Sequence, residues 1–484
     1  MESRIRELEN PTQPPESIVL QNPYVESVPT QTAQTISHSG ELPAQLRQSL
    51  LTQFLTYASE LGFFLNPACL SEPSATSSLS APIGLHTTPA LSYAALLLGA
   101  QLTSPQVVDL DIKAGLLAKT LDRTSSILST NHPDKALHAI QIHVLLSHYF
   151  LMNDRSLEGK YNLTMAISLV LSTRLHRIRS HGDSEISSQA SLAFPGIGVV
   201  PNSALALPKD VAEEKERIDA FWTVLSLNSC WSSLEGTTSS FAYWKPELNV
   251  DTPWPGVDLD PNAQSSSTIQ WFLSNTPDGA YSIMALHAKA SILFEQSFEL
   301  TRSYDSTPFS ETIQTWLLKW NTLQSLTQRF QSEVPSVESA ESAAASRRLL
   351  VIHTLLCVTK IRVLRPLPAQ VYDVSNENIR KVAIEAALLM RRVDLRETAF
   401  IDPILAMLWS IIGKTLSEEI SRDGSTQVEV DEMRDALDTI TQTMLMLSPS
   451  YPLMGRFFTD SLSPSQKADS FMIEQQLQII QDRS

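Results

Sequence analysis

Apolar residues recur every three to four positions along most of the chain from about residue 46 onward. This spacing places them on one face of a helix, and no regular succession of strand patterns interrupts it. The segment that begins at Gln45 predicts a helix ending near Gly62. Further helices are predicted near 89–101, 105–129, 135–152, 157–178, 213–236, 278–302, 309–331, 341–364, 376–395, 402–422 and 428–447. The pattern therefore predicts an all-α fold, a large irregular multi-helix bundle with long loops.

Changes in composition divide the chain into four predicted parts. Residues 1–10 carry apolar residues at the spacing of a coiled coil, and their shortness indicates a remnant of a coiled-coil linker. Residues 11–45 are rich in Pro, Ser, Thr and Gln, a composition typical of a disordered linker. The helical body is predicted over residues 46–460. The tail, residues 461–484, is predicted to end in a short amphipathic helix.

Two predicted helices are joined by a short polar turn. The helix 135–152 is apolar on most sides and should lie at the centre of the bundle. The helix 157–178 follows it after the turn at 153–155. Because helices joined by so short a loop usually form a hairpin, we expect these two to pack antiparallel.

One polar residue interrupts the apolar face of the helix 213–236, for which Gly236 is the stop signal. This face comprises Phe221, Val224, Leu225, Asn228 and Trp231. An unpaired buried amide costs about 1–3 kcal/mol, so Asn228 must bond a partner, either for packing or within a binding site. Aromatic residues at helical spacing usually fill interiors, so we favour a core role for Trp222 and Trp231 over a ligand cage.

The charge balance argues against contact of the helical body with DNA. The chain has 36 Lys and Arg against 52 Asp and Glu, a formal net charge of -16, and no stretch dense in basic residues. Because nucleic-acid affinity depends mainly on neutralising phosphates, such a body should repel DNA. Any DNA contact is therefore expected from another segment.

The three cysteines, Cys69, Cys230 and Cys357, lie far apart and form no CxxC pair. Cysteines close together in the sequence therefore form neither a disulfide framework nor a zinc site. The small number of scattered cysteines is typical of a protein in a reducing compartment. The first residues show no secretion signal, and the longest apolar runs fall short of the ~20 residues of a membrane helix. We expect a chain that is neither secreted nor inserted in a membrane.

Patterns for catalysis or metal binding are weak. His138, His143 and His148 recur at a spacing of five, which turns each side chain by about 140° around the helix. They do not share a face as zinc ligands would, so we expect ordinary core or surface histidines. The sequence has no nucleophile elbow, HExxH helix, phosphate-binding loop or DDxxD cluster. Nothing in it predicts an enzyme.

The stretch from Ala136 to Pro255 carries a series of short motifs. Their residues are Leu175, His176, Arg177, Glu213 or Glu214, Arg217, Phe221, Trp222, Asn228, Gly236, Val250, Asp251, Pro253 and Pro255. In this order they resemble the regulatory domain of fungal zinc-binuclear-cluster transcription factors, also called the fungal-specific or xylanolytic-activator-type transcription factor domain. The chain departs from that pattern at Ile218, where the family has a second Arg, at Asn228 for Asp, and at Thr237 for Pro.

The resemblance implies that Asn228 occupies a polar slot in a packed helix, where it bonds a neighbouring loop or helix. An Arg and Asp pair that would normally lock this region is half missing. The resemblance also implies a structural role, or a place in an effector pocket, for a set of motif residues. These are His176, Arg177, Arg217, Phe221, Trp222, Asn228, Trp231, Gly236 and Asp251.

The function implied by the resemblance is that of the regulatory region of a fungal factor controlling transcription by RNA polymerase II. It would sense an effector or partner and support dimers. Expected partners are a second copy or a related factor, together with co-regulators or the transcriptional machinery. The expected location is the nucleus, or both nucleus and cytoplasm.

The six-cysteine zinc cluster that binds DNA in such factors is missing from this chain. No cofactor is therefore expected here, and zinc and DNA are expected to bind only through an upstream cluster. Under this interpretation the sequence either begins downstream of a missed first exon or belongs to a factor that has lost its DNA reader.

Two other classes remain open. A cytosolic helical scaffold or interaction protein should show a repeat of about 34–47 residues, and we detect no such self-similarity. A helical enzyme such as a terpenoid synthase would require an acidic cluster for Mg²⁺, and none is visible in the sequence.

Overall fold

A computed structural model of the chain describes residues 42–70, 87–104, 107–179, 205–245, 248–257, 267–305, 310–365, 372–396, 398–422 and 426–461. Within these ranges the chain forms fourteen α-helices and no strand, which confirms the predicted all-α fold. All of these helices belong to one unit that begins at Ala44. The predicted coiled-coil remnant, linker and C-terminal tail lie, except for a few edge residues, outside the described residues.

The first five helices form the N-terminal half of this unit. They are α2 (Ala44–Tyr57), α3 (Pro89–Gln101), α4 (Leu110–Ser125), α5 (Lys135–Met152) and α6 (Ser156–Ser172). α3 packs against α2, α4 and α5. α5 and α6 pack along each other as predicted, and nearly every residue of α5 is buried. This half therefore has α5 as its central element.

Two glycines allow close contacts in this half. A Cβ atom on Gly99 of α3 would lie 2.1 Å from the carbonyl oxygen of Leu50 on α2. A Cβ atom on Gly159 of α6 would lie 2.7 Å from Cγ of Leu151 on α5. Both distances are far shorter than van der Waals contact, so only glycine permits these helix pairs to approach so closely.

The chain then crosses to the second half. α8 (Val211–Leu234) begins where the Asp210 side chain accepts a hydrogen bond from the Glu213 N–H, as an N-cap residue does. α8 packs against α6 on one side and α10 (Ile283–Asp305) on the other. α9 (Thr268–Leu273) precedes α10, and α11 (Ser310–Glu333) follows it. α8 thus connects the two halves of the bundle.

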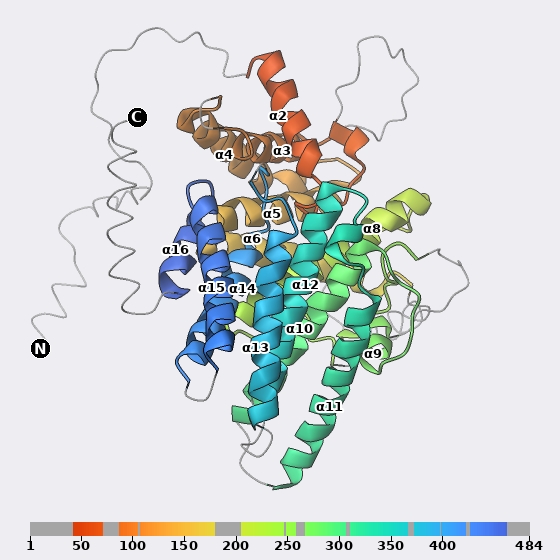
Figure 1. Cartoon of the computed structure of the whole chain (residues 1–484). Coiled ribbons are helices and arrows are strands. Elements are labelled where there is room, and N and C mark those ends of the chain that lie inside the picture. The colour runs from red at the N-terminus through yellow and green to blue at the C-terminus, as the bar shows by residue number, and fades with distance from the viewer. Residues whose placement is uncertain are drawn as a thin grey trace, which may run out of the picture. The chain divides into compact units, whose positions relative to one another are not determined.

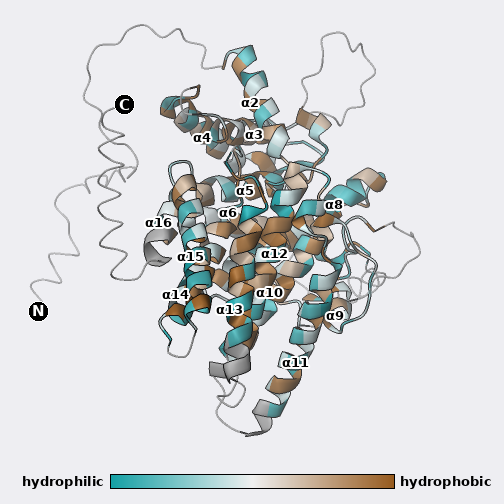
Figure 2. Ribbon diagram, viewed as in Figure 1, coloured by the Kyte–Doolittle hydropathy of each residue, from teal (hydrophilic) through white to brown (hydrophobic). Residues whose placement is uncertain are grey.

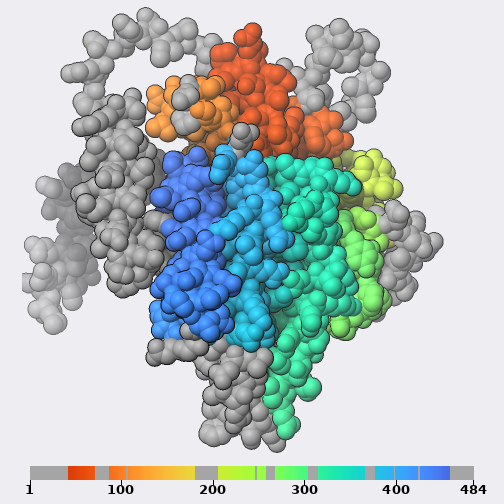
Figure 3. Space-filling view, viewed as in Figure 1, coloured from red at the N-terminus to blue at the C-terminus, as the bar shows by residue number. Residues whose placement is uncertain are grey.

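The C-terminal half is built around α12 (Ala343–Leu364), which packs against α10, α11, α13 and α14 (Figure 1). The remaining helices are α13 (Tyr372–Arg391), α14 (Ile404–Ile420), α15 (Gln427–Leu447) and α16 (Pro452–Ser461). Apolar residues are concentrated on α10 and α12, whereas α15 carries many polar positions (Figure 2). The space-filling view shows α11, α12, α13 and α15 side by side on one face (Figure 3). α12 is therefore the buried core helix of this half.

Some predicted helix boundaries are wrong. The helix predicted to reach Gly62 ends at Tyr57, and turns carry the chain on to Gly62, which has a φ of 68°. The helix predicted over 157–178 ends at Ser172, because Arg174 adopts the left-handed region before a short 3₁₀ turn. α9 and α16 were not predicted, since each is too short for a clear periodic pattern.

Candidate functional site

Asn228 lies inside α8 and has its hydrogen-bond partners within the protein. Its side-chain nitrogen donates to Oγ of Ser239 at 2.6 Å, and its backbone oxygen accepts from Oγ of Ser232. Ser239 in turn accepts from the Phe241 N–H. Gly236, with a φ of 72°, lets the chain turn back after α8 so that Ser239 reaches Asn228. The amide therefore bonds a neighbouring loop.

Trp222 fixes the extended segment that follows this loop. Its Nε1 donates to the carbonyl oxygen of Pro253 at 2.7 Å, and its ring stacks on Trp254 with centroids 4.2 Å apart. Phe221 contacts Phe241 edge to face. Trp231 is also buried. The contacts of Trp222 therefore hold the segment 249–255 against α8, and that of Phe221 holds the preceding loop at Phe241.

His176 and Asp251 meet through the backbone. The Asp251 N–H donates to the His176 carbonyl oxygen at 2.9 Å, and the Asp251 carboxylate accepts from the Ser267 N–H at 3.1 Å. His176 and Arg177 form the 3₁₀ turn after α6. This contact pins the segment 249–255 to that turn from its other side.

Arg217 lies apart from this group. Its guanidinium donates to the Ala206 carbonyl oxygen at 2.6 Å and to the Glu213 carboxylate at 2.5 Å. It precedes Asn228 by eleven residues on α8, a distance of about 16 Å at ~1.5 Å per residue. Arg217 is therefore no charge partner for position 228.

We call the group formed by Phe221, Trp222, Asn228, Trp231, Ser239 and the segment 249–255 the α8 junction. Of the sequence-predicted residues, Phe221, Trp222, Asn228, Gly236, His176 and Asp251 take part in these contacts. Trp231 is buried on the same helix, Arg177 lies next to His176 in the 3₁₀ turn, and Arg217 lies apart. A further titratable group, Glu295 of α10, lies against it and accepts a hydrogen bond from Oγ of Ser229. Burial raises the pKa of Glu295 to about 7, although hydrogen bonds from Ser229, Ser239 and Tyr243 oppose the shift. No motif marks this carboxylate in the sequence.

A cavity of about 240 Å³ lies on the other side of Trp222. Its walls come from the turn after α2, from α5, α8, α10 and α12, and from the residues before α14, so both halves of the bundle contribute. The lining residues are Ser59, Glu60, Gly62, His148, Trp222, Thr223, Ser226, Leu227, Ile283, Met284, His287, Ser342, Ala344, Ala345, Arg348 and Asp402. We call it the His148 cavity. Of the residues singled out from the motifs, only Trp222 lines it.

The three histidines of α5 are all buried, but their environments differ. Nδ1 of His138 lies 3.2 Å from Oγ1 of Thr88, and Nδ1 of His143 lies 3.0 Å from Oδ1 of Asn162. Nδ1 of His148 has no hydrogen-bond partner in the described part of the chain, and the side chain is only 3% exposed. His148 thus lines the cavity and carries a buried polar atom that has no partner among the described residues.

Both histidines that line the cavity are neutral near pH 7. Burial lowers the pKa of His148 to about 4, with nearby Asp402 opposing this shift and Arg348 adding to it. Burial, Arg348 and His148 lower the pKa of His287 well below its usual value. The two neutral rings can each donate one hydrogen bond and accept one.

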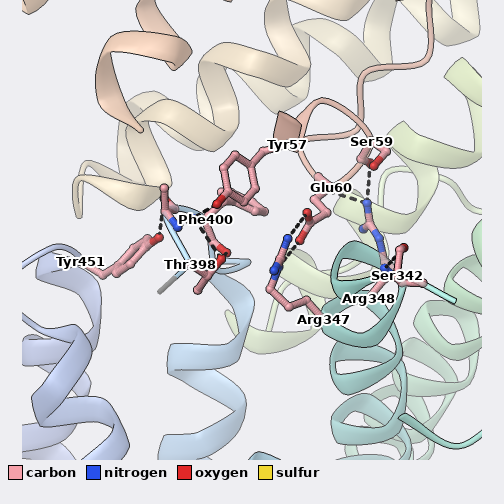
Figure 4. Close-up of polar contacts among 11 residues, drawn as sticks. Tyr57, Ser59, Glu60, Ser342, Arg347, Arg348, Thr398, Phe400 and Tyr451 are labelled. Carbon is pink, nitrogen blue, oxygen red and sulfur yellow. Dashed lines mark hydrogen bonds and ion pairs between the residues drawn. The ribbon is translucent and has the colours of Figure 1, made fainter. Parts of the chain in front are cut away.

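A set of polar contacts closes one wall of the cavity (Figure 4). Arg347 of α12 donates to both carboxylate oxygens of Glu60, each at 2.7 Å. Its neighbour Arg348 donates to the carbonyl oxygens of Ser59 at 2.7 Å and Glu60 at 3.1 Å. These contacts clamp the turn after α2 onto the first turn and a half of α12.

A second clamp holds the end of α2 to the segment before α14. The hydroxyl oxygen of Tyr57 accepts from the Ala399 N–H at 3.1 Å, and the Tyr451 hydroxyl donates to the Ala399 carbonyl oxygen at 2.8 Å (Figure 4). Phe400 lies beside the rings of Tyr57 and His148. α2 is thus bonded both to α12 and to the entrance of α14.

The described residues contain no group of three or more His, Cys, Asp or Glu that could hold a metal ion. None of the helices in those ranges is long and apolar enough to cross a membrane. The cavity, with its charged, neutral polar and apolar lining residues, is a candidate site for a small organic molecule.

Comparison with known families and proteins completes this description. The family model described as the fungal specific transcription factor domain matches residues 51–322, more than half of the chain. No curated protein and no solved structure matches. The matched range includes the cavity residues of α5, α8 and α10, whereas Arg348 and Asp402 lie beyond it.

Proposed function

Since the chain belongs to the family of the fungal-specific transcription factor domain and carries a regulatory region of that kind, we propose that it senses a small effector in the His148 cavity. In this proposal the chain acts in the nucleus, in control of transcription by RNA polymerase II. The family is in general regulatory and not catalytic, so the ligand is an effector and not a substrate. The body over residues 46–460 would be the sensing domain.

The unsatisfied Nδ1 of buried His148 is the observation that carries this proposal. Buried polar groups in native proteins nearly always have a partner, because leaving one unpaired costs about 1–3 kcal/mol. The other two histidines of α5 satisfy this rule within the protein. We infer that a ligand in the cavity supplies the missing partner when the His148 ring turns Nδ1, which solvent does not touch in this structure, toward it.

The position of the cavity suggests how binding could be transmitted. Ser59 and Glu60, which line the cavity, lie in the turn after α2, and Arg348 on the opposite wall bonds their carbonyl oxygens. A ligand that contacts both walls would stabilise this closed arrangement. α2 follows directly after the N-terminal segment, so its docking could be communicated to that segment.

Partners of the chain are a further part of the proposal. We propose homodimers or heterodimers with a related factor, supported by the coiled-coil spacing within residues 1–10, and contacts with transcriptional co-regulators. Light scattering of the full chain at micromolar concentration should detect a dimer. A chain that stays monomeric up to 100 µM, on the order of weak dimer affinities, would contradict homodimer formation.

The effector proposal is tested by filling the cavity. Ala345 lines it, whereas Ala343, two residues earlier on α12, is exposed and outside the lining. The melting temperature of the full chain is measured with and without a panel of metabolites that includes the amino acids. We expect at least one compound to raise it for wild type and for Ala343→Phe, and Ala345→Phe to abolish that rise. A rise that survives in Ala345→Phe would show that the ligand binds elsewhere.

A further inference from the structure

We propose that the His148 cavity binds a zwitterionic ligand, an amino acid whose side chain is apolar and of moderate size. This inference rests on the proposed effector role of the cavity and adds the chemical class of the effector. It follows from the charges, the neutral polar groups and the apolar wall that face the cavity.

Four charged side chains lie at the cavity or beside it. Glu60 and Arg347 neutralise each other through a two-bonded ion pair. Arg348 forms no ion pair with any residue in the described ranges. Its shorter hydrogen bonds go to backbone carbonyl oxygens, and its Nη1 lies 3.5 Å from Nδ1 of His287. Asp402 likewise lies in no ion pair among those residues, and Oδ1 accepts from the Ile404 N–H. One cation and one anion at the cavity therefore lie outside any ion pair among the described residues.

Arg348 and Asp402 face the same cavity but form no ion pair with each other. Both also act on His148, since Arg348 lowers the pKa of this histidine and Asp402 raises it. A ligand with a single charge would satisfy one of the two and repel the other, because a like charge in a desolvated site is costly. A ligand that carries one carboxylate and one ammonium group would satisfy both.

Arginine is well suited to a carboxylate, because its planar guanidinium offers donors in a fixed fork. Asp402 has a second carboxylate oxygen besides the one bonded to Ile404, and an ammonium group carries three donors. The neutral rings of His148 and His287 add hydrogen bonds without changing the charge balance. The polar part of the cavity thus matches the two charged groups of an amino acid.

Much of the remaining wall is apolar, although hydroxyl-bearing residues also line it. Trp222, Leu227, Ile283 and Met284 line the cavity together with the small residues Ala344 and Ala345. The volume of about 240 Å³ lies below the ~300–1,000 Å³ typical of sites for drug-sized ligands. It therefore fits a molecule with an aliphatic or single-ring side chain and not a nucleotide or a sterol.

The test uses matched compounds that lack one charge. L-leucine is compared with 4-methylpentanoic acid, which lacks the amino group, and with 3-methylbutylamine, which lacks the carboxylate. L-phenylalanine is compared with 3-phenylpropanoic acid and 2-phenylethylamine. Calorimetry on the full chain should show that at least one amino acid binds, and at least tenfold more tightly than its acid and its amine.

Asp402→Asn removes the anion while an amide oxygen can still accept from the Ile404 N–H. This variant should lose the preference, so that the acid binds as tightly as the amino acid. The control is Asp109→Asn at the N-cap of α4, remote from the cavity, which should bind as wild type does. Thermal melting of each variant establishes that it is folded.

The outcomes separate this inference from the proposed function. If an acid or an amine binds as tightly as its amino acid, or if only another class of compound binds, the ligand is not a zwitterion. The effector cavity still stands in that case, provided that Ala345→Phe abolishes the binding. Unchanged amino-acid preference in Asp402→Asn would also overturn the zwitterion. If no compound of any class binds the folded chain, both proposals are wrong.

Discussion

Two regions share helix α8 and differ in how their polar groups are satisfied. In the α8 junction, Asn228 bonds Ser239, and Trp222 bonds the Pro253 carbonyl oxygen. In the His148 cavity, the Nδ1 atom of His148 has no partner among the described residues, and Arg348 and Asp402 remain outside any ion pair there. Asn228 and Trp222 of the junction are thus satisfied within the protein, although Oδ1 of Asn249 and Oε1 of the adjacent Glu295 have no partner among the described residues. The cavity differs in that two charged side chains, Arg348 and Asp402, have bonding capacity left over.

The residues on which the family resemblance rests are therefore mostly not the residues that are available to a ligand. Most of the motif residues that carry the resemblance to the family, Arg217 excepted, lie in the junction, where they contact the loop and the extended segment after α8. The groups available to a ligand come instead from α5, α10, α12 and the start of α14. Trp222 alone belongs to both regions, since one of its sides stacks on Trp254 and the residue also lines the cavity.

The largest expected effect concerns Trp222. Its side chain is completely buried, so Trp222→Ala should lower the free energy of unfolding by about 3–5 kcal/mol, the usual cost of emptying a large aromatic site. Denaturant titration followed by circular dichroism measures this loss. Trp271→Ala, at a residue 55% exposed, is the control and should change stability little. Equal effects of the two substitutions would refute a packing role for Trp222.

The next effect depends on pH. Because the folded chain holds the pKa of Glu295 near 7, above its usual value of 4.5, the folded state favours the neutral carboxyl group. The stability this provides is present below about pH 4.5 and is lost as pH rises through 7. Glu295→Gln stays neutral, so at pH 8 it should be more stable than wild type by up to about 3 kcal/mol, and much less so at pH 5.

Urea unfolding of wild type and Glu295→Gln at several pH values checks this expectation. Taking the difference between their free energies of unfolding cancels the contributions of the buried histidines, which both proteins share. Glu377→Gln on α13 serves as the control, because Glu377 pairs with Lys381 at the surface and is not among the charges that act on Glu295. A difference for Glu295→Gln that does not grow with pH would contradict a raised pKa at the junction.

A smaller effect on stability is expected from substitutions of two histidines on α5, one with and one without a hydrogen-bond partner at Nδ1. His143→Phe leaves Oδ1 of Asn162 without its partner and should cost about 1–3 kcal/mol. His148→Phe removes a group that lacks a partner in the described chain and places an apolar ring beside Phe400, so stability should change by less than about 1 kcal/mol. Thermal melts of both variants decide the matter, and a larger loss for His148→Phe would mean that the cavity is structural.

Much of the helical fold could be predicted because long amphipathic patterns determine helices such as α5, α8 and α12. The burial of Asn228 and its need for a hydrogen-bond partner also follow from a single polar residue on an apolar face, whereas the resemblance left open whether a loop or a helix provides that partner. The cavity could not be predicted, because its residues are far apart in the sequence and meet only through packing. His148 precedes both Arg348 and Asp402 by at least 200 residues. On the sequence alone, His148 is indistinguishable from His138 and His143, because only tertiary contacts decide which ring finds a partner.

The most direct test of the account compares melting temperatures of wild type, Asn228→Leu and Ala345→Phe, each with and without the metabolite panel. Asn228→Leu should unfold more easily by about 1–3 kcal/mol, because Ser239 loses its partner, yet keep the ligand-induced rise. Ala345→Phe should fold but show no rise. The account would be contradicted if Asn228→Leu were as stable as wild type but lost the ligand-induced rise in melting temperature, while Ala345→Phe kept that rise. This result would place the ligand in the α8 junction.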